Sequence, residues 1–499
     1  MGRFFTAAPT GYRRKRMTHR FGRSWNALWG AVFFVFLASG IRCEAASPDP
    51  FGIEQRVVPA PHQSWQPAEP LPAVPVPLQA EPPRSTAPLS LPELTEFALR
   101  NNPRTRQAWF AARAAAAGVG IERADLLPQV TAGYGVTRTR PVSATSGDES
   151  PWQTRYGSSI TLSYVLYDFG VRENQIEAAE YRLLAANLSH NRVLQDVVLQ
   201  VEQAYYLLLG LDALVRTNEL SLKNSQTALE AVQKRRESGL ATMADVYRVE
   251  TQVAQAQLNL TRSQGDLEKA KGQLAGAVGL PVDSALRIQT MSDQPQVREM
   301  TDAMSTLLER AKINRPDLVA AEAQARAARA SADAIAKAGL PSIEVTGSSA
   351  QTSFRDDRPN ATSFSLGINL RIPLFSGFRD TYSTRQAAAQ AAQAEAARDS
   401  LYRQTELDVW QSYYDLKTAV TGIASTEAQV KSAEQTAQAT LARYRAGFGS
   451  ILDLITAQQD ESNARVQRIQ SYLGWFTALA RLNYSVGVNE VWMAASDKK

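Results

Sequence analysis

The sequence predicts an α+β fold built from two copies of one unit, in which very long helices alternate with short strands. Three observations lead to this prediction. Residues recur at a constant spacing in the two halves of the chain, long stretches lack proline, and several short segments alternate between apolar and polar residues. The 499 residues are enough for a large core or for several domains.

The first 46 residues are expected to be an export signal. A basic stretch precedes an apolar run over 27–38, and the small residues Ala45 and Ala46 follow. The run has about a dozen residues, whereas a membrane-spanning helix needs roughly 20. We therefore expect cleavage after Ala45 or Ala46, with an unprocessed membrane anchor as the alternative. The start is either Met1 or Met17.

The basic character of the chain belongs to this first segment. The chain has 54 basic and 49 acidic residues, and residues 1–46 hold eight of the basic ones and a single acid. The remaining 46 basic and 48 acidic residues give a net charge of −2, so the charge does not indicate nucleic acid binding. The one cysteine, Cys43, excludes a disulfide framework. Lipidation of Cys43 is not expected, because Arg42 stands where a lipoprotein signal has a small residue.

A proline-rich linker is expected over 47–92. Residues 48–92 contain 13 of the 24 prolines. Because proline has no backbone amide hydrogen to donate, such a segment is expected to be extended or disordered. It serves either as a spacer or as an arm along the folded body.

Beyond the linker, one unit is repeated. Asn102-Pro103 recurs 213 residues later as Arg315-Pro316, and further along the spacing becomes 208 without a gap. Alanine-rich helices can look alike by composition, but paired tyrosines and a glycine followed six residues later by aspartate, all at one spacing, argue against chance. The expected segments are a signal over 1–46, a linker over 47–92, a first repeat over 93–280, a connector over 281–302, a second repeat over 303–490 and a tail over 491–499.

Each repeat is expected to contain a shorter helix, two strands and two long helical stretches. The shorter helices, over about 104–126 and 317–338, end at a Leu-Pro pair, where proline disfavours further helix. The stretches 171–236 and 378–445 lack proline, and the first would span about 100 Å as a helix. No ordinary globular core accepts such helices, so we expect them to pack along one another as a coiled coil or tube. Eight alanines over 387–398 permit close approach.

Two segments alternate with the period of a strand. Residues 364–372 alternate apolar side chains with Ser, Gly, Asn and Arg, and residues 160–167 do so more loosely. This pattern suits a barrel wall between lipid and water, although each segment alone also suits a half-buried strand of a soluble protein. The partner strands are expected at 130–139 and 342–352, which alternate poorly. An export signal and the absence of a membrane-spanning helix from the rest of the chain favour the barrel.

Four strands cannot close a barrel, because single-chain barrels begin at eight strands. Several chains must therefore contribute, and two would give eight strands while three would give twelve. In such a barrel the polar Asn369 and Arg371 are expected to face the lumen. Trp152, Tyr156 and Phe354 at strand ends are expected at the membrane interfaces.

The chain resembles the TolC-type outer membrane channel family over roughly residues 89–490. The resemblance rests on the duplicated plan, on 166–170 and 373–377 where strand passes into long helix, and on the Gly/Asp turns. It implies an α+β membrane protein: a homotrimer whose 12-stranded outer membrane β-barrel, with four strands per chain, is continued by a long α-helical barrel. It also implies the outer membrane of a Gram-negative bacterium, with the helices extending into the periplasm.

The resemblance further implies a function without catalysis. The protein would be the exit duct of a tripartite efflux or type I secretion system, passing small molecules or unfolded protein to the exterior. Its partners would be a periplasmic adaptor and an inner membrane transporter of the RND or ABC type. The alternative is a periplasmic or surface coiled-coil scaffold without a pore.

Two turns join the long helices, over 238–242 and 446–450. Any helical hairpin needs a residue that tolerates positive φ where it reverses, which explains Gly239 and Gly447. By the resemblance, these turns are also the periplasmic tips where an adaptor docks and the tunnel narrows.

Three residues near the turns are expected to act at this entrance. By the resemblance, Asp245 pairs with Tyr444 on the neighbouring hairpin and helps to hold the entrance shut. Three copies of Asp453 would form a ring of negative charge at the constriction. Each aspartate also lies at a helix start, where the helix dipole alone favours an acid.

The chain departs from the family pattern at the entrance. The family has an arginine two residues after the second turn's glycine, where this chain has Gly449, and a second constriction aspartate, where this chain has Thr456. One clamp is therefore missing, and Arg443 and Arg445 are nearby substitutes.

No motif in the sequence indicates an enzyme, a metal site or a cofactor. The three histidines are scattered, and neither a nucleophile–base pattern, nor paired carboxylates, nor a phosphate-binding glycine motif is present. The cargo and the class of transporter are not encoded in these residues.

Overall fold

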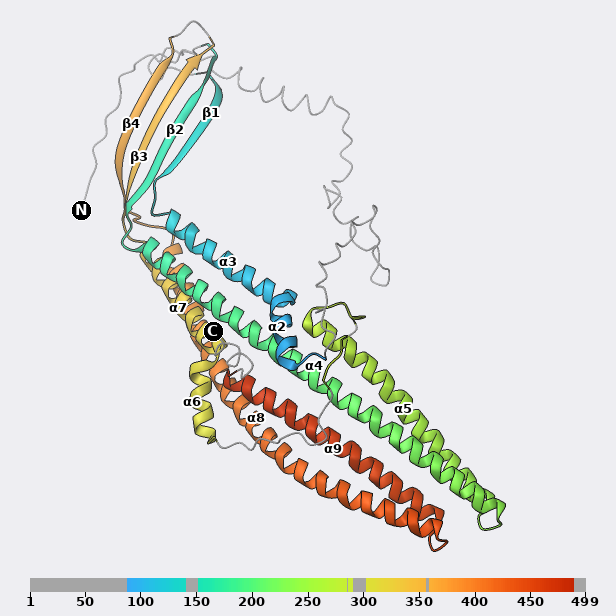
Figure 1. Ribbon diagram of the computed structural model, residues 1–499. Coiled ribbons are helices and arrows are strands. Elements are labelled where there is room, and N and C mark those ends of the chain that lie inside the picture. The colour runs from blue at the N-terminus through green and yellow to red at the C-terminus, as the bar shows by residue number, and fades with distance from the viewer. Residues whose placement is uncertain (1–87, 141–150, 285, 290–301, 356–358, 489–499) are drawn as a thin grey trace, which may run out of the picture. The chain divides into compact units, whose positions relative to one another are not determined.

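The computed structural model describes residues 88–140, 151–284, 286–289, 302–355 and 359–488 (Figure 1). The chain divides into two units, Met1–Pro77 and Leu78–Lys499, and all described residues belong to the second. The expected export signal, most of the linker, much of the connector and the C-terminal tail lie outside the described residues.

The two halves of the described chain contain the same elements in the same order. The first half consists of α2 (Leu91–Asn101), α3 (Pro103–Ala124), β1 (Gln129–Thr139), β2 (Gln153–Tyr167), α4 (Val171–Glu237) and α5 (Met243–Val278). The second consists of α6 (Met304–Asn314), α7 (Pro316–Lys337), β3 (Ser342–Phe354), β4 (Ala361–Arg371), α8 (Arg379–Arg445) and α9 (Ile451–Val486). Corresponding helices have equal lengths of 11, 22, 67 and 36 residues, as expected of two copies of one unit.

The predicted long helices are present, and a short helix precedes each predicted shorter one. α4 and α8 match the proline-free stretches to within one residue at each end. α2 begins inside the expected linker, at Leu91, because Ser90 and Glu93 form a capping box and Pro92 lies in the first turn, where a missing amide hydrogen costs nothing.

The long helices exchange neighbours along their length. Near the strands α4 packs between α3 and α7, and further along it packs between α5 and α9 (Figure 1). α8 packs first on α7 and then on α9. Small side chains permit the close approach near the strands, where Ala332 of α7 and Ala387 and Ala391 of α8 form one buried cluster. The helices therefore pack along one another, as their length requires.

Each half has its own apolar core, and a third core joins the halves. The first core lies between α2, α4 and α5, and the second lies between α6, α8 and α9. The third consists of residues at the turn ends of both long hairpins: Ala228, Val232, Val246, Val249, Tyr444, Ile451 and Leu454.

One described helix, α4, is long and apolar enough to cross a membrane by length and composition. The sequence predicts no membrane-spanning helix beyond the signal. Core helices meet this criterion of length and composition as well, and Val197, Val201 and Leu208 of α4 are buried in the first core. Packing within the protein thus accounts for part of the apolar character of α4, since 39% of the stretch that meets the criterion is buried.

The four strands form one antiparallel sheet in the order β1-β2-β3-β4. β2 and β3 occupy the centre, and they come from different halves of the chain. β1 and β4 each have one unpaired edge in the single chain.

Candidate functional site

The register gives the sheet one polar and one apolar face. Side chains that share a row across the four strands point to the same face. One row of the polar face contains Thr131, Thr161, Ser348 and Ser365, and the adjacent row of the apolar face contains Val130, Leu162, Gly347 and Leu366. The strands that alternate poorly in sequence, β1 and β3, thus follow the same division as their partners.

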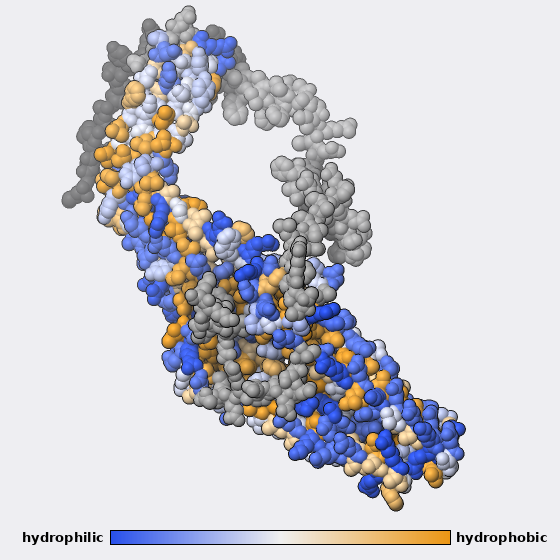
Figure 2. All heavy atoms as spheres, viewed as in Figure 1, coloured by the Kyte–Doolittle hydropathy of each residue, from blue (hydrophilic) through white to orange (hydrophobic). Residues whose placement is uncertain are grey.

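The apolar face is uncovered in the single chain. Phe364, Leu366 and Ile368 of β4 are 79, 79 and 72% exposed, and Val130, Tyr134 and Val136 of β1 are similarly exposed. Figure 2 shows hydrophobic residues over part of the sheet and mostly hydrophilic residues toward the ends of the long hairpins. A contiguous apolar face of this kind is stable against lipid or another apolar surface, and unfavourable in water.

The opposite face carries hydrogen-bonded polar side chains. Asn369 donates to Thr346 Oγ1 at 2.9 Å, and the hydroxyls of Ser348 and Ser365 lie 2.7 Å apart. Arg371 lies two residues beyond Asn369 and therefore on the same face. Both residues thus occupy the polar face, and their exposure to a lumen stays a prediction.

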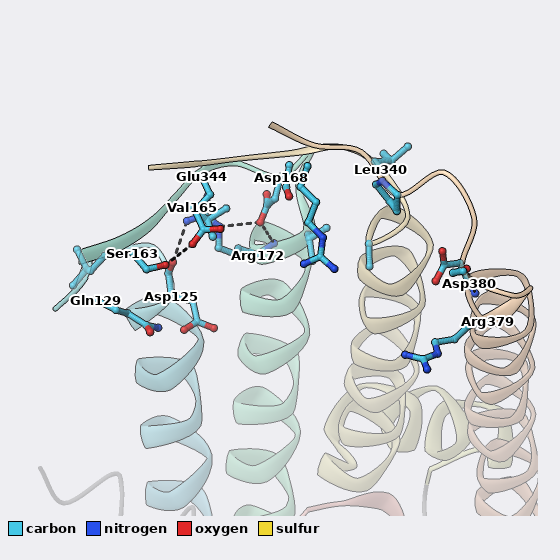
Figure 3. A pocket seen from close by; sticks show the side chains of 17 residues that line it. Asp125, Gln129, Ser163, Val165, Asp168, Arg172, Leu340, Glu344, Arg379 and Asp380 are labelled. Atoms are coloured by element: carbon cyan, nitrogen blue, oxygen red, sulfur yellow. Dashed lines mark hydrogen bonds and ion pairs between the residues drawn. The ribbon is translucent and has the colours of Figure 1, made fainter. Parts of the chain in front are cut away.

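A cavity of about 660 Å³ lies where the polar face meets the helix ends (Figure 3). Arg371, Glu344 and Ser163 line it from the strands, and Ser163 Oγ donates to the Glu344 carboxylate at 2.5 Å. Asp168 and Arg172 line it from the start of α4. The cavity is thus lined by polar side chains and by charged side chains of both signs.

The ion pair in this cavity fixes the passage from strand to helix. Arg172 Nε lies 2.8 Å from Asp168 Oδ2, and both side chains are nearly buried. Arg172 also donates to the Asp125 carbonyl oxygen at 3.0 Å, and the Gly170 amide donates to Asp168. Asp168 belongs to the 166–170 segment, and an acid just before a helix with an arginine four residues later indicates such a cap.

Aromatic side chains lie at both ends of the sheet. Trp152 is exposed, and the Arg138 guanidinium lies 5.2 Å from its ring centre. At the other end Tyr167 contacts Phe169, with ring centres 4.7 Å apart, and Phe375 and Phe378 form a similar pair. The pairs near the helices were missed in the sequence, and the interfacial role of Trp152, Tyr156 and Phe354 stays a prediction.

The two hairpin turns use glycine only for its backbone conformation. Gly239 and Gly447 have φ values of +75° and +87°, in the left-handed region. A β-carbon at either position would meet no atom within 4 Å. A role in docking therefore stays a prediction, because the turn alone explains both glycines.

Asp245 and Asp453 occupy matching capping boxes. The Asp245 carboxylate accepts hydrogen bonds from the Thr242 amide at 3.0 Å and from its hydroxyl at 2.7 Å, which hold the pKa of Asp245 below its usual value. Asp453 and Ser450 form the same motif at the start of α9. The pattern of Thr or Ser followed three residues later by an acid would have revealed both boxes in the sequence.

The expected hydrogen bond between Asp245 and Tyr444 is not among those of the described residues. Tyr444 is buried in the third core; burial and the charge of Asp245 raise its pKa, while the charge of Arg235 lowers it. The pairing of Asp245 with Tyr444 at an entrance stays a prediction. The Tyr444 carbonyl oxygen accepts a hydrogen bond of 2.6 Å from Arg235, whose guanidinium carbon lies 4.8 Å from the centre of the tyrosine ring. Arg235 matches Arg443 at the spacing of 208, but the sequence alone indicates no contact for it.

Known proteins resemble this chain over most of its length. Protein CyaE of Bordetella pertussis is 26% identical over 454 residues, which cover 89% of this chain and 90% of the relative. Outer membrane protein TolC of Vibrio cholerae is 25% identical over 415 residues, covering 79% of this chain and 91% of the relative. The solved structure of the outer-membrane channel OprN has a TM-score of 0.73 at 21% identity, covering 80% and 90% of the two chains, and this likeness shows the fold.

The family comparison covers both halves of the chain. The family model described as outer membrane efflux protein matches residues 94–280 and, again, residues 307–488. These two matches include most of the described helices and all four strands. The chain belongs to the outer membrane efflux protein family.

Proposed function

We propose that this protein is the outer membrane exit duct of a tripartite export system. In this proposal an inner membrane transporter of the RND or ABC type supplies the energy, and a periplasmic adaptor connects it to the duct. Relatives named for protease secretion, in Dickeya chrysanthemi, and for pyoverdine export, in Pseudomonas putida, support export of both protein and small-molecule cargo by such ducts. The protein itself would perform no catalysis.

The proposal rests mainly on the division of the sheet into one polar and one apolar face. The apolar face has exposed apolar side chains on β1, β2 and β4, and the polar face carries hydrogen-bonded side chains. A barrel wall with lipid outside and water inside has this division. In such a wall Asn369 and Arg371 would line the lumen.

The proposed assembly is a homotrimer. β1 and β4 have unpaired edges, and at the helix level α3 and α5 lie on one side of α4 while α8 lies on the far side of α7 and α9. Each chain therefore has one open side formed by β1, α3 and α5, and another formed by β4 and α8. Pairing β4 of one chain with β1 of the next would give twelve strands from three chains.

The hairpin turns would form the periplasmic entrance. In this proposal the adaptor docks at the turns that contain Gly239 and Gly447, and Asp453 forms a ring of three carboxylates near the axis. The apolar side chains of Leu240 and Phe448, 68 and 81% exposed at the turns, are available for such docking.

Two neighbouring positions on β4 test the proposal. Leu366→Arg puts a charge on the apolar face, where it would cost about 2–4 kcal/mol in lipid, so we expect far less assembled protein in the outer membrane fraction. Ser365→Arg is the matched control on the polar face, and we expect normal assembly with altered ion selectivity in planar bilayers. A pore-free scaffold would give no conductance for the wild-type protein, and that result would overturn the proposal.

A further inference from the structure

We propose that the cavity where the polar face of the sheet meets the helix ends binds a small zwitterion, with the ligand's carboxylate at Arg371 and Arg379 and its ammonium group at Glu344. The inference rests on the proposed function only in placing this cavity inside the duct, because the lining described here belongs to a single chain. None of the lining residues belongs to the hairpin turns, where the entrance is proposed.

The size and the walls of the cavity suit a small molecule. Its volume is about 660 Å³, and ligand pockets in proteins have volumes of about 300–1,000 Å³. All four strands contribute to the lining, and so do the first residues of α4 and α8. Figure 3 shows Glu344 beside Ser163 on one side, and Arg379 and Asp380 at the start of another helix on the other side. Charged groups therefore face the cavity from different sides.

Two arginines of the cavity have side chains that are free to bind a ligand. Arg371 ends β4, Arg379 begins α8, and both are exposed. Neither side chain forms a hydrogen bond or an ion pair with another described residue. A guanidinium has five N–H donors in a planar fork whose geometry matches a carboxylate. The two arginines can therefore hold an anionic group without breaking a contact within the described chain.

The acidic groups of the cavity disfavour a ligand with anionic groups alone. The Glu344 carboxylate accepts a hydrogen bond from Ser163 Oγ, and its second oxygen has no partner among the described residues. The carboxylates of Asp125 and Asp380, which also line the cavity, have no partner there either. These acids would repel a second carboxylate on the ligand, whereas an ammonium group can pair with Glu344. A ligand with one group of each sign thus matches the cavity better than an anion or a cation.

The first repeat shows that the fold does not require unpaired charges at this place. At the spacing of 208, Asp168 and Arg172 correspond to Ser376 and Asp380. The first two form the ion pair that fixes the passage from strand to helix. In the second repeat, Ser376 Oγ accepts a hydrogen bond from the Asp380 amide at 3.4 Å, and the described residues form no ion pair there. The second passage thus leaves its charged side chains available to a ligand.

The experiment measures the binding of triglycine to the purified full-length protein by isothermal titration calorimetry. Triglycine carries an ammonium and a carboxylate group, N-acetyltriglycine carries only the carboxylate, and triglycine amide carries only the ammonium group. We expect triglycine to bind about tenfold more tightly than either blocked peptide, the effect of one charge-assisted contact. Equal binding of all three peptides, or binding of none, would overturn the proposal.

Two substitutions and a matched control locate the site. Arg379→Gln and Glu344→Gln each remove one charge, and each should weaken triglycine binding by about tenfold. Arg385→Gln is the control, because Arg385 lies on α8 outside the cavity, with its guanidinium over the Tyr382 ring. This variant should bind triglycine like the wild type. Wild-type affinity in both Arg379→Gln and Glu344→Gln would place the binding elsewhere and refute the proposal.

Thermal unfolding separates a ligand site from a structural role of the arginines. Triglycine should raise the unfolding temperature of the wild type, because it binds the folded state, and should raise that of Arg379→Gln less. If Arg379 instead pairs with a neighbouring copy, Arg379→Gln would dissociate the oligomer and triglycine would not stabilise the wild type, which overturns the proposal. Conductance in planar bilayers tests the duct separately. A wild-type protein that binds triglycine but does not conduct would contradict the proposed function and still support the binding site.

Discussion

The two repeats stabilise the same helix–helix joint with different residues. In each repeat a short helix (α2 or α6) meets the next helix (α3 or α7) at a residue followed by proline. The second helix of the long hairpin (α5 or α9) ends against this joint. Asn102 occupies the joint of the first repeat and Arg315 that of the second. Asn102 is buried and uncharged, and it donates to the Ala277 carbonyl oxygen at 3.0 Å while accepting from the Arg104 amide.

The second joint is an ion cluster that extends into the first repeat. Arg315 is 2% exposed and lies 2.6 Å from Asp317 and 3.2 Å from Asp408. Arg192 of α4 lies 3.7 Å from Asp317. A neutral amide thus suffices to hold a joint within one repeat. The charged cluster holds the corresponding joint and also connects α4 of the first repeat to α7 of the second.

The largest expected effect is at Arg315. Arg315→Ala leaves the partly buried Asp317 and Asp408 without their main partner, so it should lower the free energy of unfolding by about 3 kcal/mol, the lower end of the loss on breaking a buried pair. Asn102→Ala is the matched substitution in the first repeat and should cost about 1–3 kcal/mol. Thermal unfolding followed by circular dichroism at fixed protein concentration measures both. Equal losses at the two positions would contradict the contrast between the joints.

The next largest difference in stability is expected between alanine substitutions at Gly279 and Gly487, the glycines that end α5 and α9. A β-carbon at Gly487 would lie 2.8 Å from Asn314 backbone atoms, whereas at Gly279 the nearest atom would be 3.2 Å away. Both have positive φ, so alanine costs about 1–2 kcal/mol at either position, and overlap at Gly487 adds about 1–3 kcal/mol. Gly447→Ala, with no atom near its β-carbon, is the control for backbone strain alone. A larger loss at Gly447 than at Gly487 would refute this ranking.

The smallest expected effect is the response of the ion cluster to acid. Burial raises the pKa of Asp317, but the hydrogen bonds from Arg315 and the charge of Arg192 outweigh it and hold the pKa below 3.8. A carboxyl with a depressed pKa stabilises the fold above its unfolded-state pKa, and this stability is lost as the pH falls through its folded-state pKa. Unfolding temperatures should therefore fall below about pH 4. Asp317→Asn should flatten this decrease, and an unchanged pH profile would exclude Asp317 as a cause.

Local patterns predicted the elements of the fold well. The proline-free stretches specify α4 and α8, and the alternation over 364–372 specifies β4, because both signals depend only on nearby residues. β1 and β3 alternate poorly, and their faces became clear only from their register with β2. Register is set by pairing across strands, which one strand's sequence does not contain.

The side-chain contacts near the turns of the two long hairpins were harder to predict. Asp245 and Asp453 were identified as helix-start acids, but the Thr242 and Ser450 that complete their capping boxes were not recognised. Arg235 and Tyr444 are separated by 209 positions, and nothing near either residue in the sequence indicates the other. Such contacts depend on how the two hairpins cross, which is a property of tertiary packing.

The unpaired edges of β1 and β4 have a consequence for biogenesis. In hydrocarbon, each backbone amide or carbonyl without a partner costs several kcal/mol, so a sheet with open edges does not persist in a bilayer. A single chain also cannot remain in water with its apolar face exposed without risk of aggregation. In the proposed trimer, closure of the sheet and entry into the bilayer must therefore occur together. Newly exported chains would need escort across the periplasm until three of them meet.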